Sequence, residues 1–150
     1  METRELIVTE LDELLGLYLH MHVSDEPLPQ RNVIEAVWQN IQDTPNFRYF
    51  GVFVEGRLVS SCTLSVVPNL SRGCRPYGLI ENVVTHSDYR RRGYGKAVLK
   101  YSLEYAWSRN CYKVMLMTGR KTEAVYKFYE SAGFNRRAKQ AFLAKPENAV

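Results

Sequence analysis

A basic, glycine-containing segment lies between two apolar patterns and constrains the fold of this 150-residue chain more than any other feature. Residues 77–85 are rich in β-branched and apolar side chains and predict a strand, whereas residues 94–109 repeat apolar side chains at helical spacing. Between them stands Arg90-Arg91-Arg92-Gly93-Tyr94-Gly95-Lys96. A strand, a glycine loop and a helix in this order predict that the loop lies at the helix N-terminus.

The rest of the chain carries further strand and helix patterns. Strands are predicted at residues 5–9, 47–54, 57–66, 77–85 and 114–118. Helices are predicted at residues 11–21, 32–42, 94–109 and 124–132, and Gly133 ends the last one. Residues 68–76 form a loop, and the remainder after residue 134 has room for one or two short strands. With no linker or repeat, residues 1–150 predict one domain of the mixed α/β (α+β) class.

The glycine loop has the chemistry of a phosphate site. A helix N-terminus presents unpaired N–H groups and a partial positive charge, and glycine lets phosphate oxygens approach the backbone. Two familiar phosphate motifs do not fit. A Walker loop would need glycine at Arg90 and a hydroxyl residue at Ala97, and the dinucleotide fingerprint would need a small residue at Val98. The ligand is therefore not assigned by either motif.

The spacing Arg-x-x-Gly-x-Gly after a strand resembles the acyl-coenzyme A loop of the GNAT N-acetyltransferase superfamily. Residues 80–84, 113–118 and 126–134 are similar to the family's fourth strand, fifth strand and late helix ending in Gly-Phe. The resemblance covers residues 77–134 in order and spacing. It implies a single GNAT-like domain with a central, mostly antiparallel, splayed sheet flanked by helices. It also implies acetyl-CoA as the co-substrate.

The resemblance further implies which residues bind this cofactor. Backbone groups of the fourth strand bind the pantetheine arm in the family, and the glycine loop binds the pyrophosphate. Thr122 stands where the family often has asparagine, and Val125 stands where it has a small residue, although Thr122 can still cap the late helix. The expected cofactor-binding residues are Val83, Val84, Thr85, Arg90, Arg91, Arg92, Gly93, Tyr94, Gly95, Lys96 and Thr122.

Acetyl transfer to an amine needs a neutral nitrogen as nucleophile and a proton for the departing thiolate. An alkyl amine has a pKa of about 10.4, so a base is required near neutral pH. Glu81 stands on an otherwise apolar strand and is the predicted base, acting directly or through water. Burial on such a strand would disfavour the charged form of its carboxyl group and so make it a better proton acceptor. Tyr129 stands at the position of the family's frequent general acid, so the resemblance implies that it protonates the CoA sulfur.

The acceptor is less constrained than the donor. Residues 1–89 carry six basic and twelve acidic residues, a net charge of −6, whereas residues 90–150 carry fourteen and four, a net charge of +10. The acidic half favours a cationic amine, whereas the 71–75 loop offers arginines for an anion. The strand at residues 80–84 and Tyr89-Arg90 are similar to glucosamine-phosphate N-acetyltransferases. A small amine, an amino sugar and an aminoglycoside therefore stay open as acceptors.

Two other functions remain as alternatives. The arginines of the glycine loop and the basic second half would also suit a nucleic-acid-binding module, although no row of stacking aromatic residues accompanies them. A CoA-binding sensor without catalysis is the other alternative.

The remaining features bear on compartment and partners. Cys62, Cys74 and Cys111 are widely spaced and odd in number, which favours a reducing, cytoplasmic compartment over a disulfide framework. No apolar run is long enough to cross a bilayer, and the N-terminus lacks a leader pattern, so no membrane is expected. His20, His22 and His86 are expected to be non-catalytic, and no metal is expected. A homodimer is consistent with the family.

Overall fold

The computed structural model describes residues 1–22 and 24–147. These residues fall into two compact units: the first lies within residues 1–116, and the described part of the second is residues 117–147. The first unit holds a five-stranded sheet in the order β1-β2-β3-β4-β5. Its strands are Glu2–Glu5, Phe47–Val54, Arg57–Val67, Tyr77–Thr85 and Val114–Leu116. The first four pair antiparallel and β5 pairs parallel with β4. The predicted mixed, mostly antiparallel sheet is confirmed.

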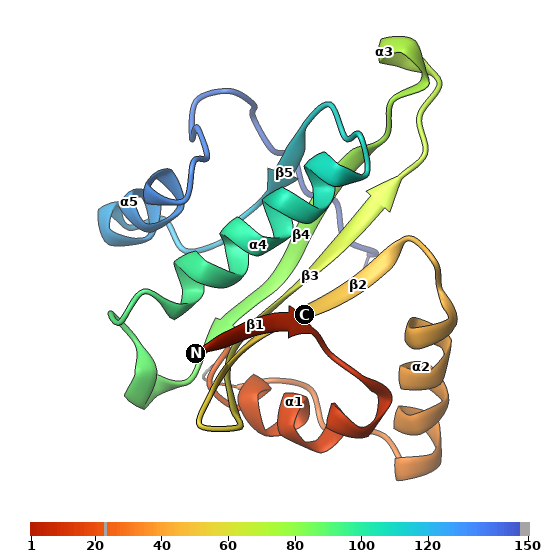
Figure 1. Ribbon diagram of the computed structural model, residues 1–150, viewed down its shortest axis with the longest axis vertical. Coiled ribbons are helices and arrows are strands. Elements are labelled where there is room, and N and C mark those ends of the chain that lie inside the picture. The colour runs from red at the N-terminus through yellow and green to blue at the C-terminus, as the bar shows by residue number, and fades with distance from the viewer. Residues whose placement is uncertain (23, 148–150) are drawn as a thin grey trace. The chain divides into compact units, whose positions relative to one another are not determined.

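Helices cover both faces of this sheet (Figure 1). They are α1 (Leu11–Tyr18), α2 (Arg31–Asp43) and α4 (Tyr94–Ser108), with a single turn, α3, at Ser71–Cys74. Tyr49 on β2 packs in one core cluster with residues of α1 and α2, whereas the next residue, Phe50, stacks on Tyr101 and Tyr105 of α4. Because neighbouring residues of a strand point to opposite faces, α1 and α2 lie on one face and α4 lies on the other.

The predicted first strand is placed wrongly. The strand covers Glu2–Glu5 rather than residues 5–9, and the chain turns at Val8–Glu10. The Glu10 carboxylate accepts a hydrogen bond from Ile7 N–H at 2.8 Å and two from the Arg4 guanidinium at 2.6 and 3.0 Å. These bonds close the turn, and Ile7 and Val8 are left exposed. An apolar run therefore does not mark a strand here.

The two features of the sheet that shape the candidate site both lie in β4. Ser61 of β3 pairs with Val84 and Thr63 pairs with Glu81, so β4 carries one extra residue between these pairs. Asn82 has a φ of +52° at this bulge, a conformation that asparagine tolerates better than most residues. Beyond the bulge β4 continues without β5, because the parallel pairing covers only Gly78–Ile80. The predicted splay of the sheet therefore begins next to Glu81.

The second unit contains α5 (Glu123–Ser131), which ends at Gly133 with a φ of +105°, as predicted. The one or two strands predicted after residue 134 are not found within the described residues 134–147. Phe142 and Leu143 are 91% and 84% exposed there, so neither side chain is covered. A strand needs a partner for its N–H and C=O groups, and residues 117–147 form no strand with which this segment could pair.

Candidate functional site

The glycine loop connects the end of β4 to α4. A short 3-10 turn at Ser87–Tyr89 follows β4, and Gly93 then begins α4 with a φ of +86°. The Gly93 carbonyl accepts the first helical hydrogen bond, from Ala97 N–H at 2.9 Å. Within the described residues no acceptor faces the N–H groups of Tyr94, Gly95 and Lys96. These amides are the ones that a helix N-terminus offers to an anion.

The surroundings of these amides fit a diphosphate. A Cβ added at Gly93 would meet no atom within 4 Å, so the space beside Gly93 at the start of the helix is open. Arg91 and Arg92 are exposed, and Lys96 is half-buried in the first turn. In the part of the chain that the structure describes, no carboxylate pairs with these three cations. Gly95 is buried, so it serves the packing of α4.

Arg90 lies in the loop but is engaged differently from its neighbours. Its Nε donates to the Thr85 carbonyl at 3.2 Å, and one terminal nitrogen donates to the His20 carbonyl at 2.8 Å. Arg90 therefore ties the loop to the end of β4 and to the segment after α1.

The second half of β4 holds the backbone groups expected to bind the pantetheine arm. Val84 is buried, whereas Val83 and Thr85 are half-buried. Ser60 fixes this part of the strand, because its hydroxyl donates to the Val84 carbonyl at 2.9 Å and lies 2.8 Å from the Thr85 hydroxyl. The edge that faces away from β3 is free of β5 from Glu81 onward. A strand edge of this kind can pair with an amide-bearing chain.

The structure corrects the expectation for the surroundings of Glu81. Its side chain is exposed rather than buried. The reason is the bulge at Asn82, which interrupts the alternation of β4 and leaves both residues at the surface. Only the Glu81 main chain is fixed, through a bond from the Thr63 hydroxyl to its carbonyl at 3.1 Å. The carboxylate is thus accessible to a substrate or a water.

The two predicted residues of the second unit lie on α5. Thr122 is the N-cap, and its hydroxyl accepts a hydrogen bond from Val125 N–H at 3.4 Å, which confirms the predicted cap. Tyr129 is half-buried, and its ring packs on Phe128 and Phe134 with centroids 4.9 and 6.4 Å apart. Phe134 N–H also donates to the Tyr129 carbonyl at 3.2 Å. The ring contacts and this main-chain hydrogen bond therefore fix Tyr129 within the second unit.

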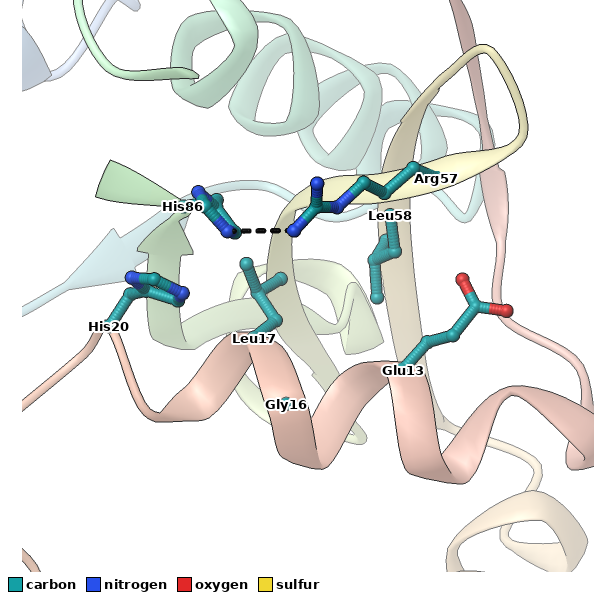
Figure 2. Close-up of a pocket in the computed structure, with 7 residues that line it drawn as sticks. All are labelled: Glu13, Gly16, Leu17, His20, Arg57, Leu58 and His86. Carbon is teal, nitrogen blue, oxygen red and sulfur yellow. Dashed lines mark hydrogen bonds between the residues drawn. The ribbon is translucent and has the colours of Figure 1, made fainter. Parts of the chain in front are cut away.

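A cavity of about 240 Å³, which the sequence did not predict, lies beside the end of β4. Figure 2 shows its lining: residues from α1 and the segment after it, the start of β3, and His86 between β4 and the 3-10 turn. The lining residues are Glu13, Gly16, Leu17, His20, Arg57, Leu58 and His86. In the sequence, the only indication of this cavity is that His86 stands four residues before Arg90 of the glycine loop.

Similarity to known proteins agrees with this geometry. Residues 10–134 match the Acetyltransferase (GNAT) family. Over 88 residues the chain is 40% identical to the glucosamine 6-phosphate N-acetyltransferase of Trypanosoma brucei brucei, a stretch that covers 59% of this chain and 58% of that protein. The chain thus spans about half the length of the curated relatives it matches, with shares of 58%, 55% and 46%.

Solved structures extend the likeness to nearly the whole chain. A putative acetyltransferase from Agrobacterium tumefaciens is 41% identical with a TM-score of 0.90, and the match covers 97% of this chain and 99% of that one. An acetyltransferase from Trypanosoma brucei is 32% identical with a TM-score of 0.80, over 96% and 99% of the two chains. GNAT acetyltransferases use acetyl-CoA as donor. With the splayed sheet and the amides at the start of α4, these matches show that the chain belongs to the GNAT family of acetyltransferases.

Proposed function

We propose that this enzyme transfers an acetyl group from acetyl-CoA to the primary amine of a phosphorylated amino sugar, by direct attack while both substrates are bound. The observation that carries the donor assignment is the set of open amides at Tyr94–Lys96, flanked by Arg91, Arg92 and Lys96 without carboxylate partners in the described chain. The acceptor assignment rests on the relative from Trypanosoma brucei brucei, which is named a glucosamine 6-phosphate N-acetyltransferase.

The proposed residues act in two regions of the donor. The N–H groups at the start of α4 and the cations around them bind the diphosphate. The free edge of β4 at Val83–Thr85 pairs with the amides of the pantetheine arm. Thr122 adds a hydroxyl from the start of α5. The diphosphate contacts fix the donor, and the strand aligns its thioester.

Three protons move during the chemical step. The amine is bound largely as its ammonium form, so Glu81, directly or through a water, removes a proton before the attack. The amine nitrogen then forms a bond to the thioester carbonyl carbon, and the C–S bond breaks with its electron pair passing to sulfur. Tyr129 donates its phenolic proton to that thiolate, and the N-protonated amide product loses its second nitrogen proton to solvent. Glu81 then releases its proton to solvent, and the Tyr129 phenolate takes up a proton, which restores both residues.

A thiol-release assay tests this function. The protein is incubated with acetyl-CoA and one amine at a time: glucosamine 6-phosphate, glucosamine, a polyamine, an aminoglycoside or a peptide. We expect the highest kcat/KM with glucosamine 6-phosphate. A higher value for unphosphorylated amines would overturn the acceptor class, and no release with any amine would overturn the proposal.

Variants test the two proton-transfer roles. Tyr129→Phe should lower kcat by roughly 100-fold, which is the usual size of a general acid's contribution. The Kd for acetyl-CoA should stay close to that of the wild type. Glu81→Gln should lower kcat/KM, and the loss should shrink as the pH approaches the pKa of the amine. Unchanged kcat in Tyr129→Phe would remove this residue as the acid.

The proposal also extends to compartment and assembly. No helix among the described residues has the length and apolarity to cross a membrane. The three free cysteines suit a reducing compartment, so we expect the enzyme in the cytoplasm. A homodimer stays a prediction, which light scattering at micromolar concentration would test.

A further inference from the structure

Two histidines from distant parts of the chain stack at the end of β4. His20, just after α1, and His86, just after β4, have ring centroids 3.9 Å apart at an interplanar angle of 36° (Figure 2). Each ring accepts a hydrogen bond from the turn that leads into the glycine loop. Ser87 N–H donates to Nδ1 of His20 at 3.4 Å, and Asp88 N–H donates to Nδ1 of His86 at 3.2 Å.

The histidine pair is linked directly to Arg90 of the glycine loop. The Arg90 guanidinium donates to the carbonyl of His20 at 2.8 Å and to the carbonyl of Thr85 at 3.2 Å. The segment from Ser87 to Arg90 is therefore attached to His20 at both ends, by an amide at one end and by a side chain at the other. Three residues later, Gly93 begins the helix that offers its amides.

The surroundings of His86 favour a neutral ring over an imidazolium. Its Nδ1 faces the Asp88 N–H, and its Nε2 lies 3.0 Å from a terminal nitrogen of Arg57, which can only donate. A neutral ring carries a proton on one nitrogen and can accept at the other, so it can accept the bond from Asp88 N–H when its proton is on Nε2. An imidazolium carries a proton on both nitrogens and turns a donor toward a donor at each contact. Burial, the His20 ring and Arg57 together lower the pKa of His86 below its ordinary value of about 6.5.

The charged groups around His86 come from four elements. Arg57 at the start of β3 and Arg90 in the loop disfavour its protonation, and the His20 ring after α1 adds to them. Asp88 in the 3-10 turn acts in the opposite direction, and its effect is smaller than those of burial, His20 and Arg57. Glu13 on α1 lines the same cavity. Two arginines, Arg57 and Arg90, therefore oppose protonation of His86, and one carboxylate, Asp88, favours it.

We propose that His20 and His86 are positioning residues that hold the glycine loop only while the His86 ring is neutral, so that donor binding weakens as the solution becomes acidic. This inference rests on the proposed donor site. When His86 takes up a proton, the cap on Asp88 N–H is lost and a cation forms beside Arg57 and Arg90. The turn at Ser87–Tyr89 then loosens, and the amides of α4 lose the fixed approach that a diphosphate needs.

The decisive experiment compares the wild type with His86→Asn. Asparagine can still cap Asp88 N–H through its side-chain oxygen, as short polar side chains do at turn starts, but it does not titrate. Calorimetric Kd values for CoA are measured between pH 5.5 and 7.5 at 0.15 M salt, where direct attraction between exposed charges is largely screened. Titration of the CoA phosphates affects both proteins equally and cancels in the comparison. His22→Asn, at an exposed histidine two residues from His20, is the matched control.

We expect the affinity of the wild type to fall about threefold to tenfold more than that of His86→Asn over this range, since uptake of one proton limits the change to about tenfold per pH unit. His22→Asn should follow the wild type. Equal pH dependence in wild type and His86→Asn would overturn the inference and leave the proposed function standing. The inference would also be overturned if the wild type bound CoA more tightly at low pH and His86→Asn did not. Attraction between the imidazolium and the CoA phosphates would then dominate.

A measurement on the wild type alone guards against a variant that does not fold. An NMR titration of the His86 ring should give a pKa below 6.5, and the amide signals of Ser87 and Asp88 should shift with the same midpoint. A midpoint at or above 6.5 would overturn the inference. No binding of CoA by either protein at any pH would overturn the proposed function and with it this inference.

Discussion

Cys62 shows at the scale of a single residue how the fold sets reactivity. It lies on β3, fully buried, with its sulfur 3.0 Å from the Ser102 hydroxyl of α4. Burial raises the pKa of this thiol to about 12, and burial also raises the pKa of Cys111. Cys74 is exposed in the turn between β3 and β4. Because the thiolate is the reactive form, only Cys74 should react readily.

Thiol labelling tests this difference. At pH 8 an aromatic disulfide reagent should modify Cys74 rapidly in the native protein, and Cys62 and Cys111 only when the protein unfolds. Cys74→Ser should remove the fast phase and leave the slow one. Fast labelling of Cys62 in the native protein would show that β3 and α4 do not pack as described.

The ion pair of Arg4 and Glu10 also acts at the residue scale. Glu10 is 7% exposed, and its hydrogen bonds with Arg4 lower the pKa of its carboxyl despite the opposing effect of burial. A lowered pKa in the folded state means that the carboxylate stabilises the fold above the unfolded value of about 4.5. This contribution is lost as the pH falls through the folded pKa.

Glu10→Gln should therefore lower the free energy of unfolding at pH 7 by about 1–3 kcal/mol, the usual effect of breaking a largely buried charged hydrogen bond. The difference from the wild type should shrink as the pH falls below the unfolded value of about 4.5 and through the lowered folded pKa, because the wild-type carboxyl takes up a proton over that range. Urea unfolding at pH 3 and pH 7 measures both values. Glu2→Gln, at the exposed partner of Arg4, is the control and should change stability little.

At the scale of elements, Gly51 allows β2 to approach its neighbours closely. A Cβ at this position would lie 2.5 Å from Leu58 Cδ1 and 2.6 Å from Leu6 Cδ1. Both leucines belong to the buried core that joins α1 and α2 to the sheet. Gly16 in α1 is different, because a Cβ there would meet no atom within 4 Å.

Alanine substitutions at these two glycines should have opposite effects. Gly51→Ala should lower the free energy of unfolding by about 1–3 kcal/mol through overpacking. Gly16→Ala should raise it by roughly 0.5–1 kcal/mol, because alanine loses less backbone freedom when a helix forms. Thermal and urea unfolding report both changes. A neutral Gly51→Ala would mean that the two leucines can move away at no cost.

At the scale of the whole molecule, binding of acetyl-CoA should raise the free energy of unfolding. A ligand at about 100 times its Kd raises the free energy of unfolding by about 2.7 kcal/mol. For a chain of this size that corresponds to a rise of roughly 5–10 °C in Tm. A thermal scan with increasing acetyl-CoA measures the shift.

Matched glycine variants separate donor binding from backbone strain. Gly93→Val and Gly56→Val each place a branched residue at a positive φ, +86° and +78° respectively, and both should lower Tm. Only Gly93→Val should also lose the shift produced by acetyl-CoA, because its side chain would enter the space beside Gly93 at the start of the helix. An undiminished shift in Gly93→Val would contradict the proposed diphosphate site.

Sequence periodicity determined the elements that carry the site. The strand at Tyr77–Thr85 was predicted with its observed bounds, and β2, α2 and α4 differ from their predictions by at most one residue at each end. These segments have strong local patterns and clear end signals, such as the Glu55-Gly56 turn. The position of the glycine loop at the start of α4 followed from the order of strand, glycines and helix alone.

Only the tertiary structure decided the surroundings of the key side chains. The bulge at Asn82 exposes Glu81, and no local pattern in β4 announced an extra residue, since bulges depend on the partner strand. The contact of Arg90 with the carbonyl of His20, seventy residues earlier, was not predicted, and its role as a phosphate ligand stays a prediction. Periodicity is a property of neighbours along the chain, whereas burial, bulges and such contacts arise only when distant segments pack together.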